Sequence, residues 1–246
     1  PPPTGCADSH NRNPNESPTP PSPRVTEALP AAIGDTLRLY PAPMSNAAAE
    51  ALAAAHGVDP AWVRLGNGED ELIAMCFRAF AGAGERVAFT WPTYPLLEPL
   101  CGIHEAVASP HPLGDGWSLP PHFADDPAPL KFLVNPNSPT GTWYGREQVE
   151  RVVASARGVI VLDEAYVDFA PESRLDLLEG HDNLLILRTM SKAYALAGMR
   201  IGFAFGHPDL LPAPDTGNDP YHPHRLTPPA PNPAPRGPRP PAPALP

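Results

Sequence analysis

Short, uninterrupted apolar runs recur along the middle of the chain and predict buried strands. They lie at residues 131–134, 159–162 and 184–187, and residues 87–90 are predicted as a further strand. Continuous apolar runs are typical of strands covered on both faces of a parallel sheet, whereas strands with one exposed face alternate between apolar and polar residues. We therefore expect these four strands at the centre of one sheet.

Segments with helical spacing separate these runs. An alanine-rich helix is predicted at 46–56, ended by Gly57, and a second at 68–81, with acidic residues in its first turn. Two more are predicted at 94–101 and 146–157. Alternating strands and helices predict an α/β fold, a three-layer sandwich around a mainly parallel sheet. In such sheets ligands bind beyond the carboxyl ends of the strands.

Proline content separates the two ends of the chain from this central part. The chain has 246 residues and 39 prolines, many of them near the two ends. Proline has no backbone donor, and neither end shows apolar periodicity, so we expect no packed core there. The predicted organisation is a proline-rich N-terminal arm at 1–24, a large domain at 25–211 and a proline-rich, disordered tail at 212–246.

Charge and composition argue against several classes of protein. A formal net charge of -10 without a basic stripe argues against nucleic-acid binding. No apolar run reaches the length of a membrane span, and no signal peptide is recognisable, so a cytoplasmic location is expected. Cys6, Cys76 and Cys101 are widely spaced and odd in number, which predicts neither a disulfide framework nor a metal site.

The strongest chemical signal follows the last apolar run. Ser191 and Lys192 stand side by side in a turn of small residues, and Arg200 comes eight positions after the lysine. Lysine can form a Schiff base with an aldehyde, while serine and arginine can donate hydrogen bonds to a phosphate. The alternative is a plain strand, turn and strand with Lys192 as a surface cation. Other motifs must decide between them.

Two turns contain groups that could complete such a site. Gly68 begins the second predicted helix, where free amides of Glu69 and Asp70 could face an anion. The alternative is a glycine turn with acidic caps, because carboxylates repel phosphate. Asn137 and Ser138 lie in an Asn-Pro-Asn-Ser-Pro-Thr-Gly turn that can hold a donor still, unless it is an ordinary surface loop.

Three further side chains follow predicted strands. Asp163 comes directly after a buried run, where a carboxylate needs a cation such as a protonated pyridine nitrogen. A helix cap or a magnesium ligand is an equally open interpretation. Tyr166 could reach a hydroxyl on that ring. Tyr94, after Trp-Pro-Thr, could stack on a flat ring, although ordinary packing explains it as well.

In this order the motifs resemble those of pyridoxal-phosphate-dependent aminotransferases of fold type I, and above all the histidinol-phosphate aminotransferase family. Residues 188–200, Arg-Thr-Met-Ser-Lys-Ala-Tyr-Ala-Leu-Ala-Gly-Met-Arg, are similar to that family's Arg-Thr-Leu-Ser-Lys-Ala-Phe-Gly-Leu-Ala-Gly-Leu-Arg. Residues 13–18 look like its N-terminal substrate-side motif, and residues 37–41 like its arginine-tyrosine-proline element. The resemblance runs from about residue 13 to about residue 211.

The resemblance implies pyridoxal 5'-phosphate as cofactor and a role for each matching residue. Lys192 would be the Schiff-base lysine and the base that moves the substrate Cα proton. Asp163 would pair with the pyridine nitrogen, Tyr166 with the ring oxygen, and Tyr94 would stack on the ring. Tyr40 would reach the phosphate of the neighbouring subunit, which implies a homodimer.

The phosphate group would lie between two segments. The implied phosphate donors are Ser191, Arg200, the turn at Gly68 and the amides of Glu69 and Asp70. Serine is commoner in the family at position 69. The family's ring-oxygen asparagine stands just before Pro-Thr-Gly, where this chain has Ser138, with Asn137 one residue earlier. We expect a weakened contact with the ring oxygen.

The family continues well beyond this chain, with a small domain whose arginine binds the substrate carboxylate. Residues 219–226 echo a family segment only faintly, so we expect this domain to be missing. The implied reaction converts histidinol phosphate and 2-oxoglutarate to imidazole acetol phosphate and glutamate, in histidine biosynthesis. The alternatives are an aromatic amino acid aminotransferase, a threonine-phosphate decarboxylase, or an inactive, truncated remnant.

Overall fold

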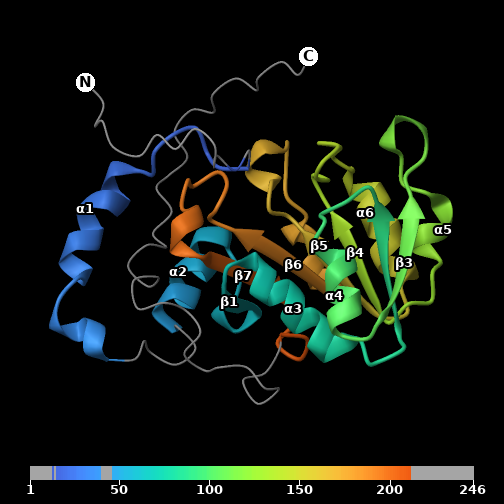
Figure 1. Ribbon diagram of the computed structural model, residues 1–246, viewed down its shortest axis with the longest axis horizontal. Coiled ribbons are helices and arrows are strands. Elements are labelled where there is room, and N and C mark those ends of the chain that lie inside the picture. Colours follow the sequence, from blue (N-terminus) through green and yellow to red (C-terminus); the bar gives the residue numbers. More distant parts are fainter. Residues whose placement is uncertain (1–12, 14, 40–45, 212–246) are drawn as a thin grey trace.

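A computed structural model describes residues 13, 15–39 and 46–211 (Figure 1). The roles predicted for Tyr40 and for the tail at 212–246 lie outside the described residues. Within these ranges, none of the helices is long and apolar enough to cross a membrane.

A seven-stranded sheet forms the centre of the fold. In chain order its strands are β1 (Val63–Asn67), β2 (Arg86–Trp91), β3 (Val107–Pro112), β4 (Leu130–Val134), β5 (Val159–Asp163), β6 (Leu184–Thr189) and β7 (Ile201–Gly206). They lie side by side in the order β1-β7-β6-β5-β4-β2-β3. The pairs from β6 to β3 are parallel, whereas β7 is antiparallel to both β6 and β1. The predicted mainly parallel sheet is confirmed.

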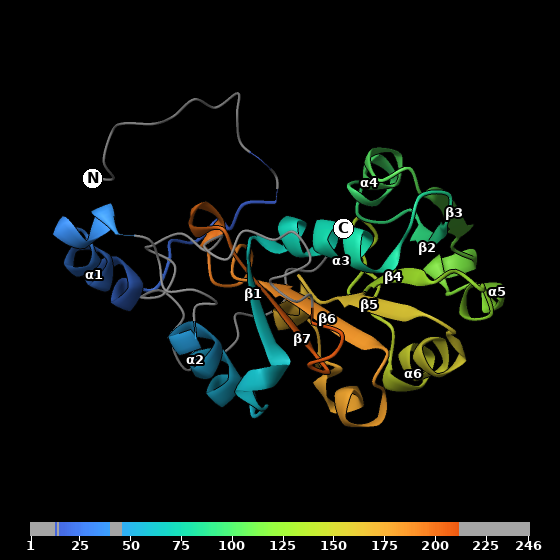
Figure 2. The ribbon, with the colours of Figure 1, turned by 90° about the horizontal axis from the view of Figure 1, so that it is seen from below.

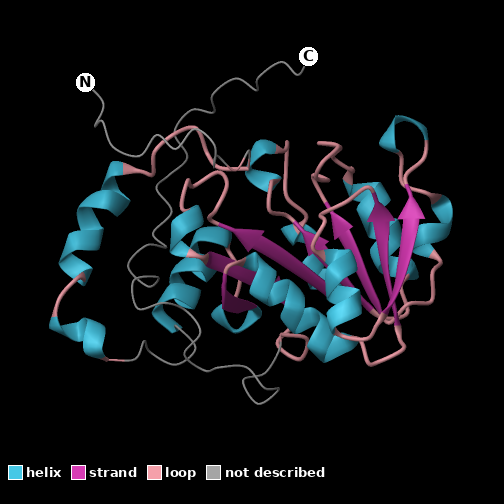
Figure 3. Ribbon diagram, in the orientation of Figure 1, coloured by secondary structure: helices cyan, strands magenta, loops and turns pink. Residues whose placement is uncertain are grey.

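Helices connect the strands. The α-helices are α1 (Pro23–Ala32), α2 (Asn46–His56), α3 (Glu69–Phe80), α4 (Leu97–Ile103), α5 (Pro121–Ala124) and α6 (Arg146–Ser155). Short 3-10 helices are η1 (Asp35–Arg38), η3 (Pro60–Trp62), η4 (Asp115–Trp117), η5 (Val167–Phe169), η6 (Leu175–Gly180) and η7 (Ala197–Met199). Figure 3 shows α1 at one end of the molecule, away from the strands.

Helices cover both faces of the sheet, as Figure 2 shows, with α3 and α4 on one face and α2 and α6 on the other. Strand β5 illustrates why. Ile160 and Leu162 pack into the cluster that contains α2 and α6, while Val161 packs into the cluster that contains α3 and α4. Successive side chains of a strand point to opposite faces, so a continuous apolar run fills two cores at once.

Most predicted elements are found, with shifted ends. Helix α2 spans the predicted residues, and the four predicted strands lie within β2, β4, β5 and β6. The helix predicted from Tyr94 begins only at Leu97. Tyr94 precedes Pro95, and a residue directly before proline disfavours the helical conformation. β3 was not predicted. It contains Pro110 and Pro112, which an edge strand tolerates.

Candidate active site

The carboxyl ends of three neighbouring parallel strands bring the predicted site together. Asp163 is the last residue of β5, Asn137 and Ser138 follow β4, and Ser191 and Lys192 follow β6. In the strand register, Asp163 pairs with Val134 on one side and with Leu187 on the other. The polar residues therefore meet at one edge of the sheet. Their catalytic and binding roles stay predictions.

The start of α3 packs closely against β7 and the residue before it. Gly68 has a φ of 81°, and its amide donates to the carbonyl of Arg200 at 2.8 Å. A Cβ at Gly68 would lie 2.3 Å from Nη2 of Arg200, and one at Gly202 would lie 2.5 Å from the amide nitrogen of Glu69. Glycine at both positions lets the helix start approach the arginine, so the start of α3 lies beside its guanidinium.

Asp70 joins two residues that were predicted to contact different parts of the cofactor. Its Oδ1 accepts a hydrogen bond from the hydroxyl of Tyr94 at 2.9 Å, and its Oδ2 accepts one from Nη2 of Arg200 at 3.3 Å. Burial, and next the charge of Asp70, raises the pKa of Tyr94. Tyr94 therefore stays neutral and is held by its hydroxyl.

Glu69 and Asp163 form a buried pair of carboxyls. Their residues are 8% and 4% exposed, and their side chains hydrogen-bond each other. Asp163 Oδ1 also accepts a hydrogen bond from the Ala165 amide at 2.9 Å. Burial is the main cause that raises both pKa values. Two ionised carboxylates can only accept hydrogen bonds, so a hydrogen bond between these two side chains requires a proton on one of them.

Lys192 lies beside an aromatic ring that the N-terminal motif also reaches. Its Nζ is 5.6 Å from the centre of the Tyr166 ring. The hydroxyl of Tyr166 donates to Oδ1 of Asn15 at 3.2 Å. Burial, followed by the charges of Asp163 and Glu69, raises the pKa of Tyr166. The segment that resembles the substrate-side motif thus contacts the site through Asn15.

The turn after β6 is held by its own hydroxyl groups. Oγ1 of Thr189 lies 2.9 Å from Oγ of Ser191 and accepts a hydrogen bond from the Ser191 amide at 3.1 Å. The Met190 amide donates to the carbonyl of Ile201 on β7. The buried Ser191 hydroxyl is therefore fixed next to the lysine.

Asn137 and Ser138 differ in how much of their hydrogen-bonding capacity is used. The side-chain nitrogen Nδ2 of Asn137 donates to the carbonyl of Pro92 at 3.0 Å and to Oγ1 of Thr140 at 2.9 Å. Both of its protons are thereby committed to the loops after β2 and β4. Within the described ranges, the Ser138 side chain makes no hydrogen bond.

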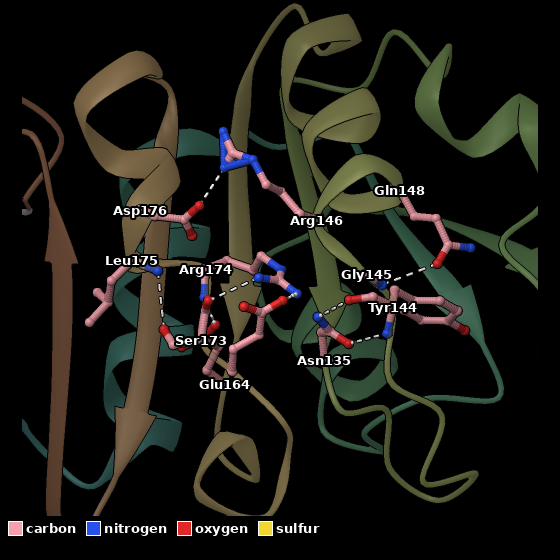
Figure 4. Close-up of polar contacts among 11 residues, drawn as sticks. Asn135, Tyr144, Gly145, Arg146, Gln148, Glu164, Ser173, Arg174, Leu175 and Asp176 are labelled. Atoms are coloured by element: carbon pink, nitrogen blue, oxygen red, sulfur yellow. Dashed lines mark hydrogen bonds and ion pairs between the residues drawn. The ribbon is translucent and has the colours of Figure 1, made fainter.

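A second polar cluster next to the site was not predicted. Arg188 donates from Nε and Nη2 to Oε2 of the buried Glu164. The same carboxylate accepts hydrogen bonds from the Ser173 hydroxyl at 2.8 Å and the Arg174 amide at 2.7 Å, as Figure 4 shows from its labelled residues. The only signal in the sequence is the second acidic residue in a row at the end of β5, directly after Asp163, and the arginine near the end of β6. The cluster joins β5, β6 and the segment before η6.

Comparison with known proteins identifies the family. The sequence profile described as "Aminotransferase class I and II" matches residues 9–230. The histidinol-phosphate aminotransferase of Syntrophotalea carbinolica is 42% identical over 214 residues, which are 87% of this chain and 62% of that protein. That of Bordetella parapertussis, named histidinol-phosphate aminotransferase 1, is 44% identical over 203 residues, 81% of this chain and 57% of that protein.

Solved structures have the same fold. The histidinol-phosphate aminotransferase of Sinorhizobium meliloti, determined in complex with pyridoxal-5'-phosphate, superposes with a TM-score of 0.80 at 32% identity, over 89% of this chain and 62% of that one. This chain thus spans about three fifths of the length of the relatives that it matches. The profile match and the identity to these relatives show that the chain belongs to the class I and II aminotransferase family.

Proposed function

We propose that this chain is the cofactor-binding part of a pyridoxal-phosphate-dependent transaminase that acts on histidinol phosphate and 2-oxoglutarate. The observation that supports it most is the position of Lys192 after β6, with the buried Asp163 at the end of the neighbouring β5. The relatives named histidinol-phosphate aminotransferase support the substrate. The match with this chain covers about three fifths of the length of these relatives.

The residues at this edge of the sheet fit a phosphorylated pyridine, with one exception. The first-turn amides of α3 and the side chains of Ser191 and Arg200 would hold the phosphate, as donors that a dianion requires. The glycines at 68 and 202 leave no Cβ between the helix start and Arg200. Asp163 would pair with the ring nitrogen. The exception is Glu69, whose carboxyl already occupies Asp163.

Each remaining role falls to a residue of this chain. Bound pyridoxal phosphate supplies a ring that accepts the electron pair left when the substrate Cα loses its proton. Lys192 would remove that proton with its Nζ and return it. Tyr94, held by Asp70, would cover one face of the ring and exclude water there. The hydroxyl of Tyr166 would donate to the ring oxygen in place of its contact with Asn15.

The homodimer, the contribution of Tyr40 across it and the cytoplasmic location stay predictions. Sedimentation of the purified chain with and without pyridoxal phosphate would test the dimer. The domain boundaries near residues 25 and 211 are tested by limited proteolysis, which is expected to remove the two ends and leave the sheet.

The sequence makes the decisive experiment simple, because its only lysines are Lys131 and Lys192. Nζ of Lys131 is buried and donates to the carbonyls of Phe123 and Ala124. After incubation with pyridoxal phosphate and reduction with borohydride, mass spectrometry should find the adduct on the Lys192 peptide. Lys192→Ala should abolish it and Lys131→Met should keep it. An unlabelled Lys192 peptide in the folded chain would refute the proposal.

A second step separates the substrates. The cofactor-loaded chain is mixed with histidinol phosphate, phenylalanine or threonine phosphate, and the cofactor is recovered and separated chromatographically. The proposal expects conversion to pyridoxamine phosphate by histidinol phosphate. Conversion by phenylalanine alone supports an aromatic aminotransferase. Release of carbon dioxide from threonine phosphate supports a decarboxylase, and labelling of Lys192 without conversion of any donor supports an inactive remnant.

A further inference from the structure

The backbone and the side chain of Glu69 suit different partners. Its amide is among the first-turn donors of α3 that suit a phosphate. Its carboxyl is buried, points to Asp163, and has one oxygen, Oε1, without a hydrogen-bond partner. A buried acid with an unused oxygen is costly, so the contact with Asp163 must offset part of that cost.

Charged groups from several segments surround Glu69. Asp163 lies at the end of β5 and Asp70 is the next residue of α3, while Lys192 follows β6. Arg200, before β7, pairs with Asp70. The tyrosines at 94 and 166 also interact with the Glu69 charge. The charge of Glu164, which pairs with Arg188, also acts on Asp163. Carboxyls therefore outnumber cations around the Glu69–Asp163 pair, which favours a proton on it, and burial raises the pKa of both members.

We propose that Glu69 competes with the cofactor for Asp163: its protonated carboxyl donates to Asp163 in the position that the ring nitrogen would take, and binding must displace it. This inference rests on the proposed function. It makes Glu69 a determinant of cofactor affinity that acts through Asp163. A serine at this position would be too short to make the contact.

Glu69 could also weaken cofactor binding in a second way, by repelling the phosphate, and this explanation predicts different results. If Glu69 weakened binding only by repelling the phosphate, its effect would not depend on Asp163. The two explanations are separated by a double-mutant cycle, because residues that act through each other are not additive. Glu69→Gln adds a second distinction, since its neutral amide removes the charge and can still donate to Asp163.

The experiment measures the dissociation constant of pyridoxal phosphate by absorbance titration. We expect Glu69→Ser to bind about tenfold more tightly than the unchanged chain, which corresponds to one net hydrogen bond. Glu69→Gln should bind like the unchanged chain. In the Asp163→Asn background, Glu69→Ser should have no further effect. Glu147→Gln, an exposed glutamate in the first turn of α6, is the matched control and should change nothing.

The inference is overturned if Glu69→Ser does not tighten binding, if it tightens binding equally with Asn at position 163, or if Glu69→Gln binds as tightly as Glu69→Ser. Infrared difference spectra of the unchanged chain against Glu69→Gln provide a measurement that needs no cofactor and no serine variant. They should show the C=O stretch of a protonated carboxylic acid, and its absence would also overturn the inference. If Lys192 is not labelled but this band is present, the proposed function fails and the carboxyl pair stands.

Discussion

Arg188 and Glu164 form a buried ion pair beside the site, with Nε and Nη2 of the arginine 3.0 and 2.8 Å from Oε2 of the glutamate. Their side chains are 4% and 1% exposed. Glu164 follows Asp163 directly, and Arg188 lies four residues before Lys192. The pair therefore holds the ends of β5 and β6 at a fixed separation, and with them the two residues that the proposed function needs most.

Breaking this pair should destabilise the fold strongly. Glu164→Ala leaves the Arg188 guanidinium buried without its carboxylate, which should lower the free energy of unfolding by about 3 to 5 kcal/mol. The control is Arg146→Ala, which breaks the exposed pair with Asp176 seen in Figure 4 and should cost less than about 1 kcal/mol. Urea unfolding measures both. Equal losses in the two variants would contradict a structural role for the buried pair.

Asp126 should make stability depend on pH in the acid range. Burial alone would raise the pKa of this carboxyl, but hydrogen bonds from the Ala128 amide, His111 and Arg86 outweigh burial and lower it from 3.8 to about 2. A depressed folded-state pKa stabilises the fold above the unfolded value, and this contribution is lost as pH falls from about 4 to about 2. It amounts to about 2 kcal/mol.

The test compares urea unfolding at neutral pH and across that acid range. Asp126→Asn should lose about 2 kcal/mol at neutral pH and show a flatter acid dependence than the unchanged chain. The control is Asp125→Asn, at the exposed neighbouring residue. It should alter neither the stability at neutral pH nor its dependence on acid. Parallel acid profiles for the unchanged chain and Asp126→Asn would show that the carboxyl is not stabilised by these contacts.

Gly202 is expected to tolerate no larger residue. A Cβ there would lie 2.4 Å from the Gly68 carbonyl carbon and 2.5 Å from the Glu69 amide nitrogen, which are backbone atoms that cannot move alone. Gly202→Ala should therefore push the start of α3 away from β7, at a cost of about 1 to 3 kcal/mol. It should also weaken binding of inorganic phosphate, since the first-turn amides shift.

The control for this substitution is Gly180→Ala, at the end of η6, where an added Cβ would meet no atom within 4 Å. Thermal unfolding and equilibrium dialysis with phosphate compare the two variants. A Gly202→Ala chain that is as stable as Gly180→Ala would mean that the close approach of α3 to β7 is not required.

The sequence predicts the location of the site better than its internal contacts. Continuous apolar runs define buried parallel strands, and a polar residue just after such a run must lie at the carboxyl edge, which places Asp163 and Lys192 correctly. The sequence does not predict which side chains contact one another within the site. That Glu69 turns toward Asp163, or that Arg188 meets Glu164, depends on neighbours from other strands and leaves no periodic signal. The antiparallel β7 was expected only in the alternative of a plain strand, turn and strand. Its Gly202 is explained by the approach of α3, and its Gly206 by the Leu185 side chain of β6.

Asn137 and Ser138 should separate into a structural and a binding role. Asn137→Ala removes both donors that join the loops after β2 and β4 and leaves the Pro92 carbonyl without this partner. We expect a loss of about 1 to 3 kcal/mol in the free energy of unfolding. Ser138→Ala removes a hydroxyl with no hydrogen bond in the described part of the chain, so stability should stay within about 0.5 kcal/mol.

The affinity for pyridoxal phosphate, unlike stability, should depend on Ser138 rather than on Asn137. If the Ser138 hydroxyl donates to the ring oxygen, Ser138→Ala should raise the dissociation constant of pyridoxal phosphate about five- to tenfold, the value of one hydrogen bond. Ser138→Thr keeps a hydroxyl and should retain most of the affinity. The opposite result is that Asn137→Ala loses affinity at unchanged stability while Ser138→Ala binds pyridoxal phosphate normally. Asn137, and not Ser138, would then be the residue that donates to the ring oxygen.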